Sequence, residues 1–184
     1  VADFMAGNGY FTELLGRLVG PRGTVYALNP PSFHDPKDWE KGGNAKANIR
    51  TLVVPVAQMQ LAPASIDVLF AHHTYHDLYW ESERFKYPRL DVPVVLADWF
   101  RAVKPGGHVV IVDHVGAAGD PRATANKLHR IDPAQVKADM AAAGFVLVAE
   151  SAVLQRSDDN HATSVFAPEM RGKTDRMALK FRRP

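Results

Sequence analysis

The first fifteen residues decide the fold of this chain: Val1-Ala2-Asp3-Phe4-Met5-Ala6-Gly7-Asn8-Gly9-Tyr10-Phe11-Thr12-Glu13-Leu14-Leu15. A short apolar run passes through an acid into two glycines, and helical spacing of apolar residues follows. This order predicts a strand, a tight turn and the start of a helix. Glycines let the backbone approach a ligand closely because they carry no Cβ. The free N–H groups at a helix start attract an anionic or polar group.

A nicotinamide or flavin dinucleotide is one ligand of such a turn. Its fingerprint is G-x-G-x-x-G/A directly after the strand, with an acid about 20 residues further on. Here Thr12 occupies the third glycine position, and the next predicted strand is followed by Asn29. The acid before the glycines, Asp3, has no role in that fingerprint. A nicotinamide-dependent oxidoreductase therefore stays open only as an alternative.

The size and composition of the chain are those of one soluble globular domain, residues 1–184. The net charge of +2 gives no reason to expect a nucleic-acid partner, and no apolar run is long enough for a membrane span. The absence of cysteine excludes disulfides, thiolate zinc sites and a cysteine nucleophile. Because Val1 already lies within the first predicted strand, we expect an upstream segment. We also expect a cytoplasmic location and allow for a homodimer.

Strand and helix patterns alternate along the rest of the chain, which predicts right-handed parallel crossovers and an α/β fold. Strands are predicted at residues 24–28, 50–56, 66–71, 108–114, 145–150 and 177–181. Helices are predicted from Thr12, around 43–48, across 92–103 and across 133–143.

The fourth predicted strand is followed by the stretch with the most potentially catalytic side chains, His72-His73-Thr74-Tyr75-His76-Asp77-Leu78-Tyr79-Trp80. Ligands of open α/β sheets bind at the carboxyl ends of the strands, so this loop faces the same crevice as the glycine turn. We predict catalytic roles for His73, His76 and Asp77, with one imidazole as proton acceptor and the carboxylate orienting it. Neighbouring strand residues point in opposite directions, so His72 and His73 are not expected to act together. Side chains that only satisfy nearby backbone groups are the alternative.

A metal site is a rival hypothesis for the same region. Its nitrogen and oxygen ligands would be His73, His76, Asp77, Asp113 and His114. No H-x-x-x-H spacing or ligand pair on one helix face accompanies them. The sequence therefore predicts no metal.

An aromatic segment follows the histidine loop and contains Tyr79, Trp80, Phe85 and Tyr87 with charged residues between them. Such a segment could cover an apolar acceptor as a lid, or pack on its own domain as an amphipathic helix. Both interpretations stay open.

The order of elements, the Asp3-to-Gly9 turn and the phrase Phe100-Arg101-Ala102-Val103-Lys104-Pro105-Gly106-Gly107 together resemble class I S-adenosylmethionine-dependent methyltransferases. Their first motif reads acid-x-G-x-G-x-G, and Met5 replaces its first glycine. Three further stretches look like a bacterial group of predicted methyltransferases: Tyr75-His76-Asp77-Leu78, His129-Arg130-Ile131-Asp132 and Arg171-Gly172-Lys173-Thr174-Asp175.

The resemblance implies a Rossmann-like, doubly wound, mostly parallel seven-stranded sheet, ordered 3-2-1-4-5-7-6, with the last strand antiparallel. It also implies methyl transfer from S-adenosylmethionine, which we expect to go to oxygen or carbon of a small-molecule acceptor. The implied cofactor residues are Asp3, Gly7 and Gly9 at the methionine part, Asn29 at the ribose, Gln58 at the adenine and His72 beside the sulfonium. The acids that the family has at the ribose and adenine positions are missing. A non-catalytic domain that binds a nucleotide-like ligand or a partner protein therefore stays open as an alternative.

Overall fold

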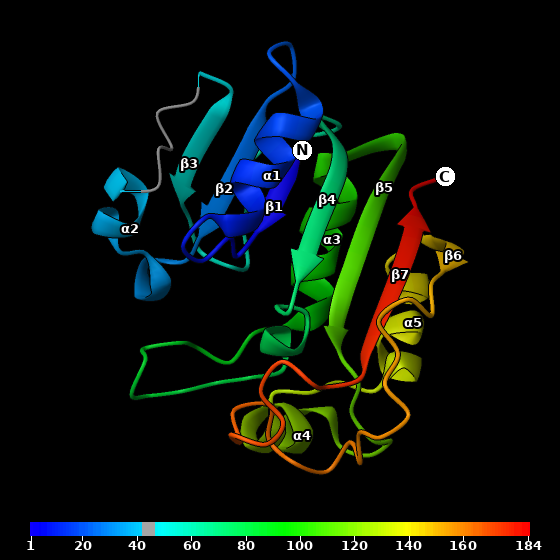
Figure 1. Ribbon diagram of the computed structural model, residues 1–184. Helices are drawn as coiled ribbons and strands as arrows, with labels where there is room; N and C mark the ends of the chain where they lie inside the picture. The colour runs from blue at the N-terminus through cyan, green and yellow to red at the C-terminus, as the bar shows by residue number, and fades with distance from the viewer. Residues whose placement is uncertain (42–46) are drawn as a thin grey trace.

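The computed structural model describes residues 1–41 and 47–184, which form a seven-stranded sheet ordered β3-β2-β1-β4-β5-β7-β6 (Figure 1). β1 to β5 run parallel, and β7 is antiparallel to both of its neighbours. The predicted order and the antiparallel last strand are confirmed. The strands are β1 Ala2–Phe4, β2 Val25–Asn29, β3 Ile49–Val53, β4 Ile66–His72, β5 Val103–His114, β6 Val146–Glu150 and β7 Arg176–Arg182.

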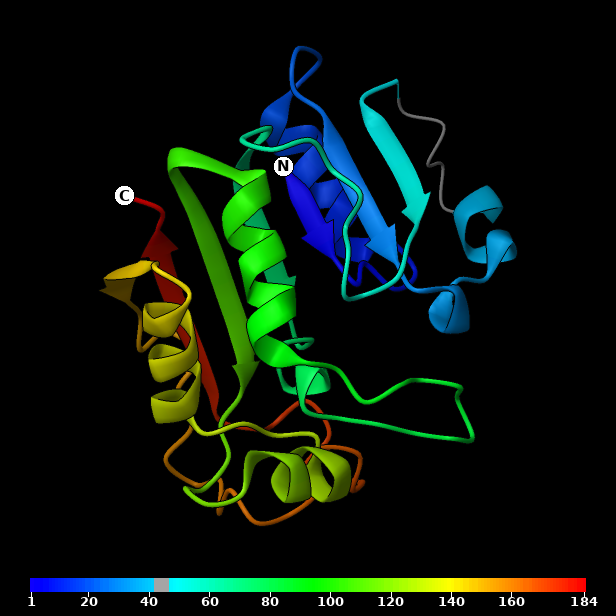
Figure 2. The same cartoon turned by 180° about the vertical axis from the view of Figure 1, so that it is seen from behind.

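Helices cover both faces of the sheet, as the doubly wound fold requires. α1 lies on one face (Figure 1), while α3 and α5 lie on the other (Figure 2). None of the helices in the described ranges is long and apolar enough to cross a membrane. The helices are α1 Tyr10–Val19, α2 Pro36–Lys41, α3 Val92–Ala102, α4 Pro121–Leu128 and α5 Pro133–Ala142, with short 3₁₀ turns η1 Pro31–Phe33 and η2 His76–Leu78.

The core between the sheet and α3 is aromatic at its centre. Trp99 of α3 is fully buried, and its ring meets Phe4 edge-on at 4.7 Å between centroids. The ring of Tyr75, from the loop after β4, contacts the same tryptophan at 6.1 Å. The histidine loop is therefore packed onto the core and held in one position.

α4 is a helix that the hydrophobic pattern does not predict, because Ala125 is its only buried residue. Its start nevertheless carries the same signal as α5, an aspartate followed by proline at the first helical position. Asp120 accepts hydrogen bonds from two backbone N–H groups of α4, and Asp132 accepts one from the backbone of α5. α4 lies beyond the carboxyl end of β5, next to the loop of residues 151–175 (Figure 1).

Two predicted strand boundaries differ from the observed ones by more than two residues, and one predicted helix is not tested. The helix predicted around 43–48 falls mainly outside the described residues. β3 ends at Val53 and not at residue 56, although the N–H of Val54 still bonds the carbonyl of Asn29. β5 begins at Val103 and not at residue 108, because Val103 pairs with β4 ahead of an irregularity in the ladder.

The aromatic segment contains no helix, so its interpretation as an amphipathic helix is wrong. One antiparallel bridge, between Ser82 and Tyr87, joins its two arms. The rings of Trp80 and Tyr87 stack on Phe33 of η1 at 6.0 and 5.4 Å between centroids. The segment thus crosses the carboxyl ends of the strands from β4 to the loop after β2 (Figure 1).

Candidate active site

The turn between β1 and α1 has the backbone geometry that the glycines predict. Gly7 and Gly9 have φ angles of 57° and 87°, in the left-handed region. Met5, which stands where the family has glycine, has a φ of 54°. The left-handed conformation costs a non-glycine residue about 1–2 kcal/mol. An added Cβ on Gly7 would meet no protein atom within 4 Å, so the turn faces open space there.

Asp3 is buried beneath this turn. Its Oδ2 accepts a hydrogen bond of 2.6 Å from the hydroxyl of Thr12. Burial raises the pKa of Asp3 to about 6, and the Thr12 hydrogen bond opposes the shift only in part. No cationic side chain of the described residues contributes to this balance, so within that part of the chain the carboxylate lacks a positive partner.

The side chain of Asn29 bonds the backbone of the glycine turn. Its Oδ1 accepts from the N–H of Gly7 at 2.9 Å, and its Nδ2 donates to the carbonyl of Gly7 at 3.1 Å. The side chain is buried, and the space beside it has a volume of only about 10 Å³, with Met5 as part of its wall. Gln58 is exposed and does not line this space. A nucleoside would therefore require the flexible Met5 side chain to move.

The histidines at the end of β4 form a stack of rings. His72 and His73 lie 3.8 Å apart between centroids, and His73 lies 4.0 Å from His114 of β5. The prediction that His72 and His73 point apart is wrong, because His73 has a φ of 56° and leaves the strand conformation. Burial lowers the pKa of His72 and of His114 to about 4, and that of His73 further.

His76 is oriented by Asp113, a fully buried residue of β5. The carboxylate accepts from the backbone N–H of His76 at 2.9 Å and lies 2.8 Å from its Nδ1. Burial opposes ionisation of Asp113, but the charge and hydrogen bonds of His76, with the nearby His114 ring, outweigh burial and hold the pKa of Asp113 well below its usual range. The N–H of His114 also donates to this carboxylate at 2.7 Å. An ionised carboxylate can only accept, so Nδ1 of His76 donates. The orienting carboxylate is thus Asp113, whereas the sequence pointed to Asp77.

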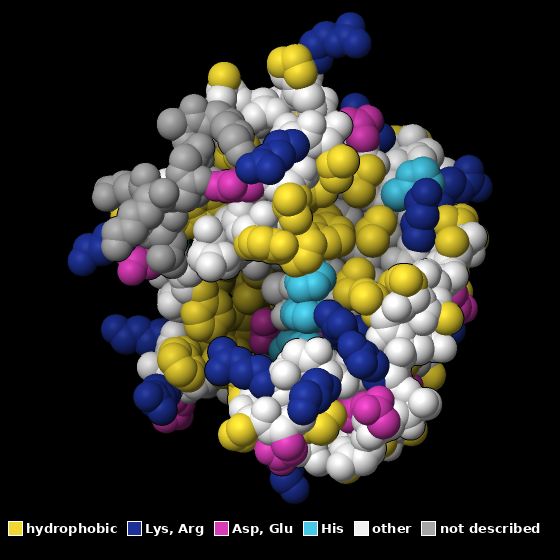
Figure 3. All heavy atoms as spheres, viewed as in Figure 1, with side chains coloured by type: hydrophobic (Ala, Val, Ile, Leu, Met, Phe, Trp, Pro, Cys, Tyr) yellow, Lys and Arg dark blue, Asp and Glu magenta, His cyan; other side chains and the backbone are white. Residues whose placement is uncertain are grey.

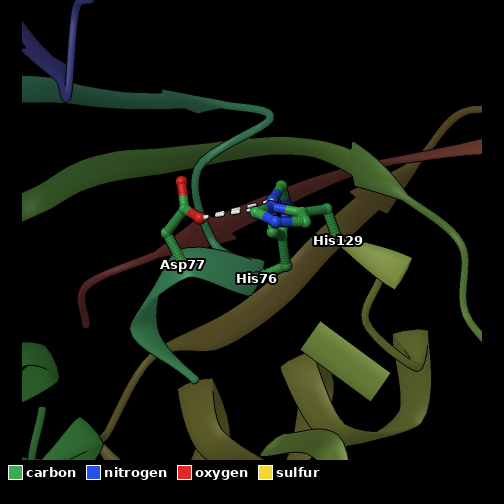
Figure 4. Close-up of side chains that lie close together, drawn as sticks. All are labelled: His76, Asp77 and His129. Carbon is green, nitrogen blue, oxygen red and sulfur yellow. Dashed lines mark hydrogen bonds and ion pairs between the residues drawn. The ribbon is translucent and has the colours of Figure 1, made fainter. Parts of the chain in front are cut away.

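His129 is the site residue that sequence reasoning missed. It ends α4 with a φ of 52°, and its Nδ1 lies 3.3 Å from Nε2 of His76. Oδ1 of Asp77 lies 3.4 Å from the same Nε2 and 3.8 Å from Nδ1 of His129 (Figure 4). Burial works against a charged His76, but the Asp113 and Asp77 carboxylates outweigh it and raise the pKa of His76 to about 9. The only sequence signal for His129 was its place in the His129-Arg130-Ile131-Asp132 stretch.

Two tyrosines anchor the histidine loop to α5. The hydroxyls of Tyr75 and Tyr79 donate to Oδ2 of Asp139, at 3.0 and 2.7 Å. Gln135 donates to the other oxygen of the same carboxylate at 2.7 Å. The loop is therefore fixed at Asp113 on one side and at Asp139 on the other.

A cavity of about 420 Å³ opens above this cluster. Figure 3 shows histidine side chains in a hollow bordered by hydrophobic ones. This volume suits a small organic ligand. The lining residues are Phe33, Trp80, Phe85, Val165 and Phe166 as apolar walls, and His73, His76, Asp77, His114 and His129 as polar groups.

A family model described as "Methyltransferase domain" matches residues 2–111, which cover β1 to most of β5. The chain belongs to this methyltransferase family. The match confirms the predicted class I methyltransferase and its classification as an enzyme, and the glycine turn and the histidine loop both lie inside the matched region.

Solved structures share the methyltransferase fold at low sequence identity. A SAM-dependent methyltransferase from Aquifex aeolicus is 18% identical with a TM-score of 0.70, over 100% of this chain and 81% of that one. The Burkholderia thailandensis 1,6-didemethyltoxoflavin-N1-methyltransferase, with bound 1,6-didemethyltoxoflavin and S-adenosylhomocysteine, is 15% identical with a TM-score of 0.63, over 99% and 69%. The [4+2]-cyclase SpnF is 14% identical with a TM-score of 0.69, over 100% and 73%. At these identities the structures show the fold alone, and no functionally curated protein matches the sequence.

Proposed function

We propose that this methyltransferase transfers a methyl group from S-adenosylmethionine to oxygen or carbon of a small, largely apolar acceptor. The observation that carries the proposal is the cavity of about 420 Å³, which combines aromatic walls with basic atoms at the carboxyl ends of the strands. β4, which carries the histidine loop, pairs directly with β1, which leads into the glycine turn. A cofactor on the turn and an acceptor in the cavity would therefore be neighbours.

The residues of the turn fit the methionine part of the cofactor. The space above Gly7 is open, and the buried carboxylate of Asp3 lacks a positive partner that an ammonium or sulfonium group would supply. When bound, the cofactor supplies a methyl group on sulfur, which is a good leaving group. The protein then has to align the two reactants and exclude water. His72, at the end of β4, would lie on the sulfonium side of the cavity.

The acceptor is proposed to bind between the aromatic walls, with its reactive atom toward the polar groups. Trp80 and Phe85 come from the segment that crosses the strand ends, so this segment would act as a lid. Asp77 is proposed to take up the acceptor's proton, because the raised pKa of His76, about 9, leaves that imidazole protonated at neutral pH. His76, held in place by Asp113, would donate a hydrogen bond to the reacting oxygen. His73, the other predicted catalytic residue, lies against His114 at the side of the same cavity.

Asp3→Asn is expected to stabilise the protein and weaken cofactor binding at the same time. Between pH 3.8 and about 6 the folded protein keeps a proton on Asp3 that the unfolded chain has lost, so raising the pH through this range lowers stability. Since one pKa unit corresponds to about 1.4 kcal/mol, removing the buried charge should increase the free energy of unfolding at pH 7 by about 1–3 kcal/mol. Urea denaturation measures this gain, and calorimetric titration should show S-adenosylmethionine binding at least about tenfold weaker. Unchanged affinity would remove Asp3 from the cofactor site.

Thermal-shift titration tests the proposed function against its alternatives. S-adenosylhomocysteine is expected to raise the melting temperature progressively with concentration, because a ligand that binds only the folded state stabilises it. NAD⁺ is expected to have no effect, since the turn lacks the third glycine and the acid of the dinucleotide fingerprint. Stabilisation by NAD⁺ alone would favour an oxidoreductase. No stabilisation by either ligand would favour the non-catalytic alternative. Asn29 and Met5 would then block the space that the nucleoside of the cofactor needs.

A further inference from the structure

We propose that His76, Asp77 and His129 form a binding site for a divalent transition-metal ion, with zinc as the first candidate. The three ligand atoms are Nε2 of His76, Oδ1 of Asp77 and Nδ1 of His129, and they form a triangle with sides of 3.3, 3.4 and 3.8 Å (Figure 4). A point equidistant from these atoms lies about 2.0 Å from each, which is the usual length of zinc–nitrogen and zinc–oxygen bonds. The side chains therefore need little movement to bind the ion.

The surroundings of His76 are those of a metal-binding histidine. Ligating histidines usually donate their second ring N–H to a carboxylate, which fixes the ring and its tautomer. Nδ1 of His76 has this partner in Asp113 at 2.8 Å, and its Nε2 faces the triangle. Asp113 is in turn fixed by two backbone N–H groups, those of His76 and His114. Nε2 of His76 lies next to the other two ligand atoms, and a bound ion would replace the proton on this nitrogen.

The ligand atoms also select the kind of ion. Two imidazole nitrogens and one carboxylate oxygen suit zinc and its neighbours in the first transition row, whereas magnesium and calcium prefer oxygen ligands alone. The two nearby carboxylates, Asp77 and Asp113, carry charges that a divalent cation balances, although both are largely buried. Two histidines and one carboxylate leave a fourth position for water or substrate, as in catalytic zinc sites.

The fourth position opens into the 420 Å³ cavity, because all three proposed ligands line it. This consequence rests on the proposed function. An acceptor hydroxyl bound to the ion would lose its proton to solvent more readily, since a bound divalent metal lowers the pKa of a coordinated O–H. The resulting oxygen would form the new C–O bond as the C–S bond of the sulfonium breaks, leaving a neutral thioether. The ion would thus favour methylation at oxygen over carbon.

Cobalt(II) titration of chelator-treated protein tests the site directly, because four-coordinate cobalt absorbs visible light and substitutes for zinc. The expected result is a saturable visible spectrum at one ion per chain, which zinc then displaces. His129→Gly removes a ligand at a left-handed position that glycine occupies without strain, so the fold should persist. Cobalt binding should weaken at least about 100-fold in this variant, which corresponds to about 3 kcal/mol.

His73→Gly is the matched control. It also replaces a left-handed histidine of the same cavity with glycine, but outside the triangle. Its cobalt affinity should stay within about threefold of the wild type. No saturable binding by the wild type, or equal losses in the two variants, would overturn the assignment. Titrating the same metal-free protein with S-adenosylhomocysteine separates the two proposals: stabilisation without cobalt binding rejects only the metal site, and cobalt binding without stabilisation rejects only the proposed function.

Discussion

Gly7→Ala is expected to lose binding of S-adenosylhomocysteine by at least about 100-fold while the protein keeps its fold. Both polar backbone groups of Gly7 are bonded to the Asn29 side chain, so the part of this residue that faces open space is its Cα. A Cβ added there contacts no protein atom within 4 Å. The methyl group would instead occupy space that the cofactor needs, because ligands approach such turns at backbone distance. Calorimetric titration measures the loss.

Gly172→Ala is the matched control for this prediction. Gly172 also has a left-handed φ, 77° against 57° for Gly7, and its added Cβ likewise meets nothing within 4 Å. Both variants should lose about 1 kcal/mol of folding stability, because alanine is strained in this conformation. Only Gly7→Ala should lose ligand affinity. If its affinity is unchanged while the stability loss appears, the glycine turn does not contact the cofactor.

Arg130→Met is expected to lower the free energy of unfolding by about 3–5 kcal/mol. The Arg130 side chain is fully buried and binds Asp159 through two hydrogen bonds, of 2.7 and 3.0 Å. It also donates to the carbonyls of Thr163 and Val115, each at 2.8 Å. Methionine fills the volume but leaves the Asp159 carboxylate buried without its cation, which is the costly way to break an ion pair. Urea denaturation gives the change.

Two further variants show whether the uncompensated charge is the cause. Lys137→Met breaks the exposed pair with Glu150 and should cost no more than about 1 kcal/mol, because water screens both groups. Arg130→Met combined with Asp159→Leu should regain part of the loss, since neither charge of this pair is then left buried. A cost below about 1 kcal/mol for Arg130→Met alone would contradict this account. The pair matters for the site because it holds the loop that carries Val165 and Phe166 of the cavity wall.

Local sequence patterns predict the elements that bury a clear apolar face. The strands of the sheet carry apolar runs, and α5 carries both a capping aspartate and buried Val136 and Met140. Apolar periodicity does not predict α4, because Ala125 is the only residue of this helix that is buried. The sequence predicts a helix up to residue 103 and a strand from residue 108, but the pairing of Val103 with Ile66, which makes β5 begin at Val103, is a long-range contact that no local pattern reveals.

The candidate site could be located from the sequence but not resolved in detail. His76 and Asp77 follow the fourth strand, and the rule that ligands bind at the carboxyl ends of strands places them correctly. His129 is 53 residues away in the chain from His76, and only the packing of α4 beyond β5 brings the two rings together. The sequence chose the wrong partner for His76, because Asp77 and Asp113 are chemically alike and only the packing of β5 beside the loop brings Asp113 to Nδ1.

What the sequence by itself determined is the glycine turn, from its short motif, and the alternation of strands and helices, from apolar periodicity. The methyltransferase family and the order of the sheet came from the resemblance that these motifs carry. What only the tertiary structure decided is the use of the polar side chains. In the folded protein the side chain of Asn29 is hydrogen-bonded to the backbone of Gly7, and the ring of His73 lies against those of His72 and His114. Asp113, and not Asp77, orients the ring of His76. These outcomes depend on side-chain directions and on contacts between distant segments, and the linear pattern of residues carries no information on the angles that set them.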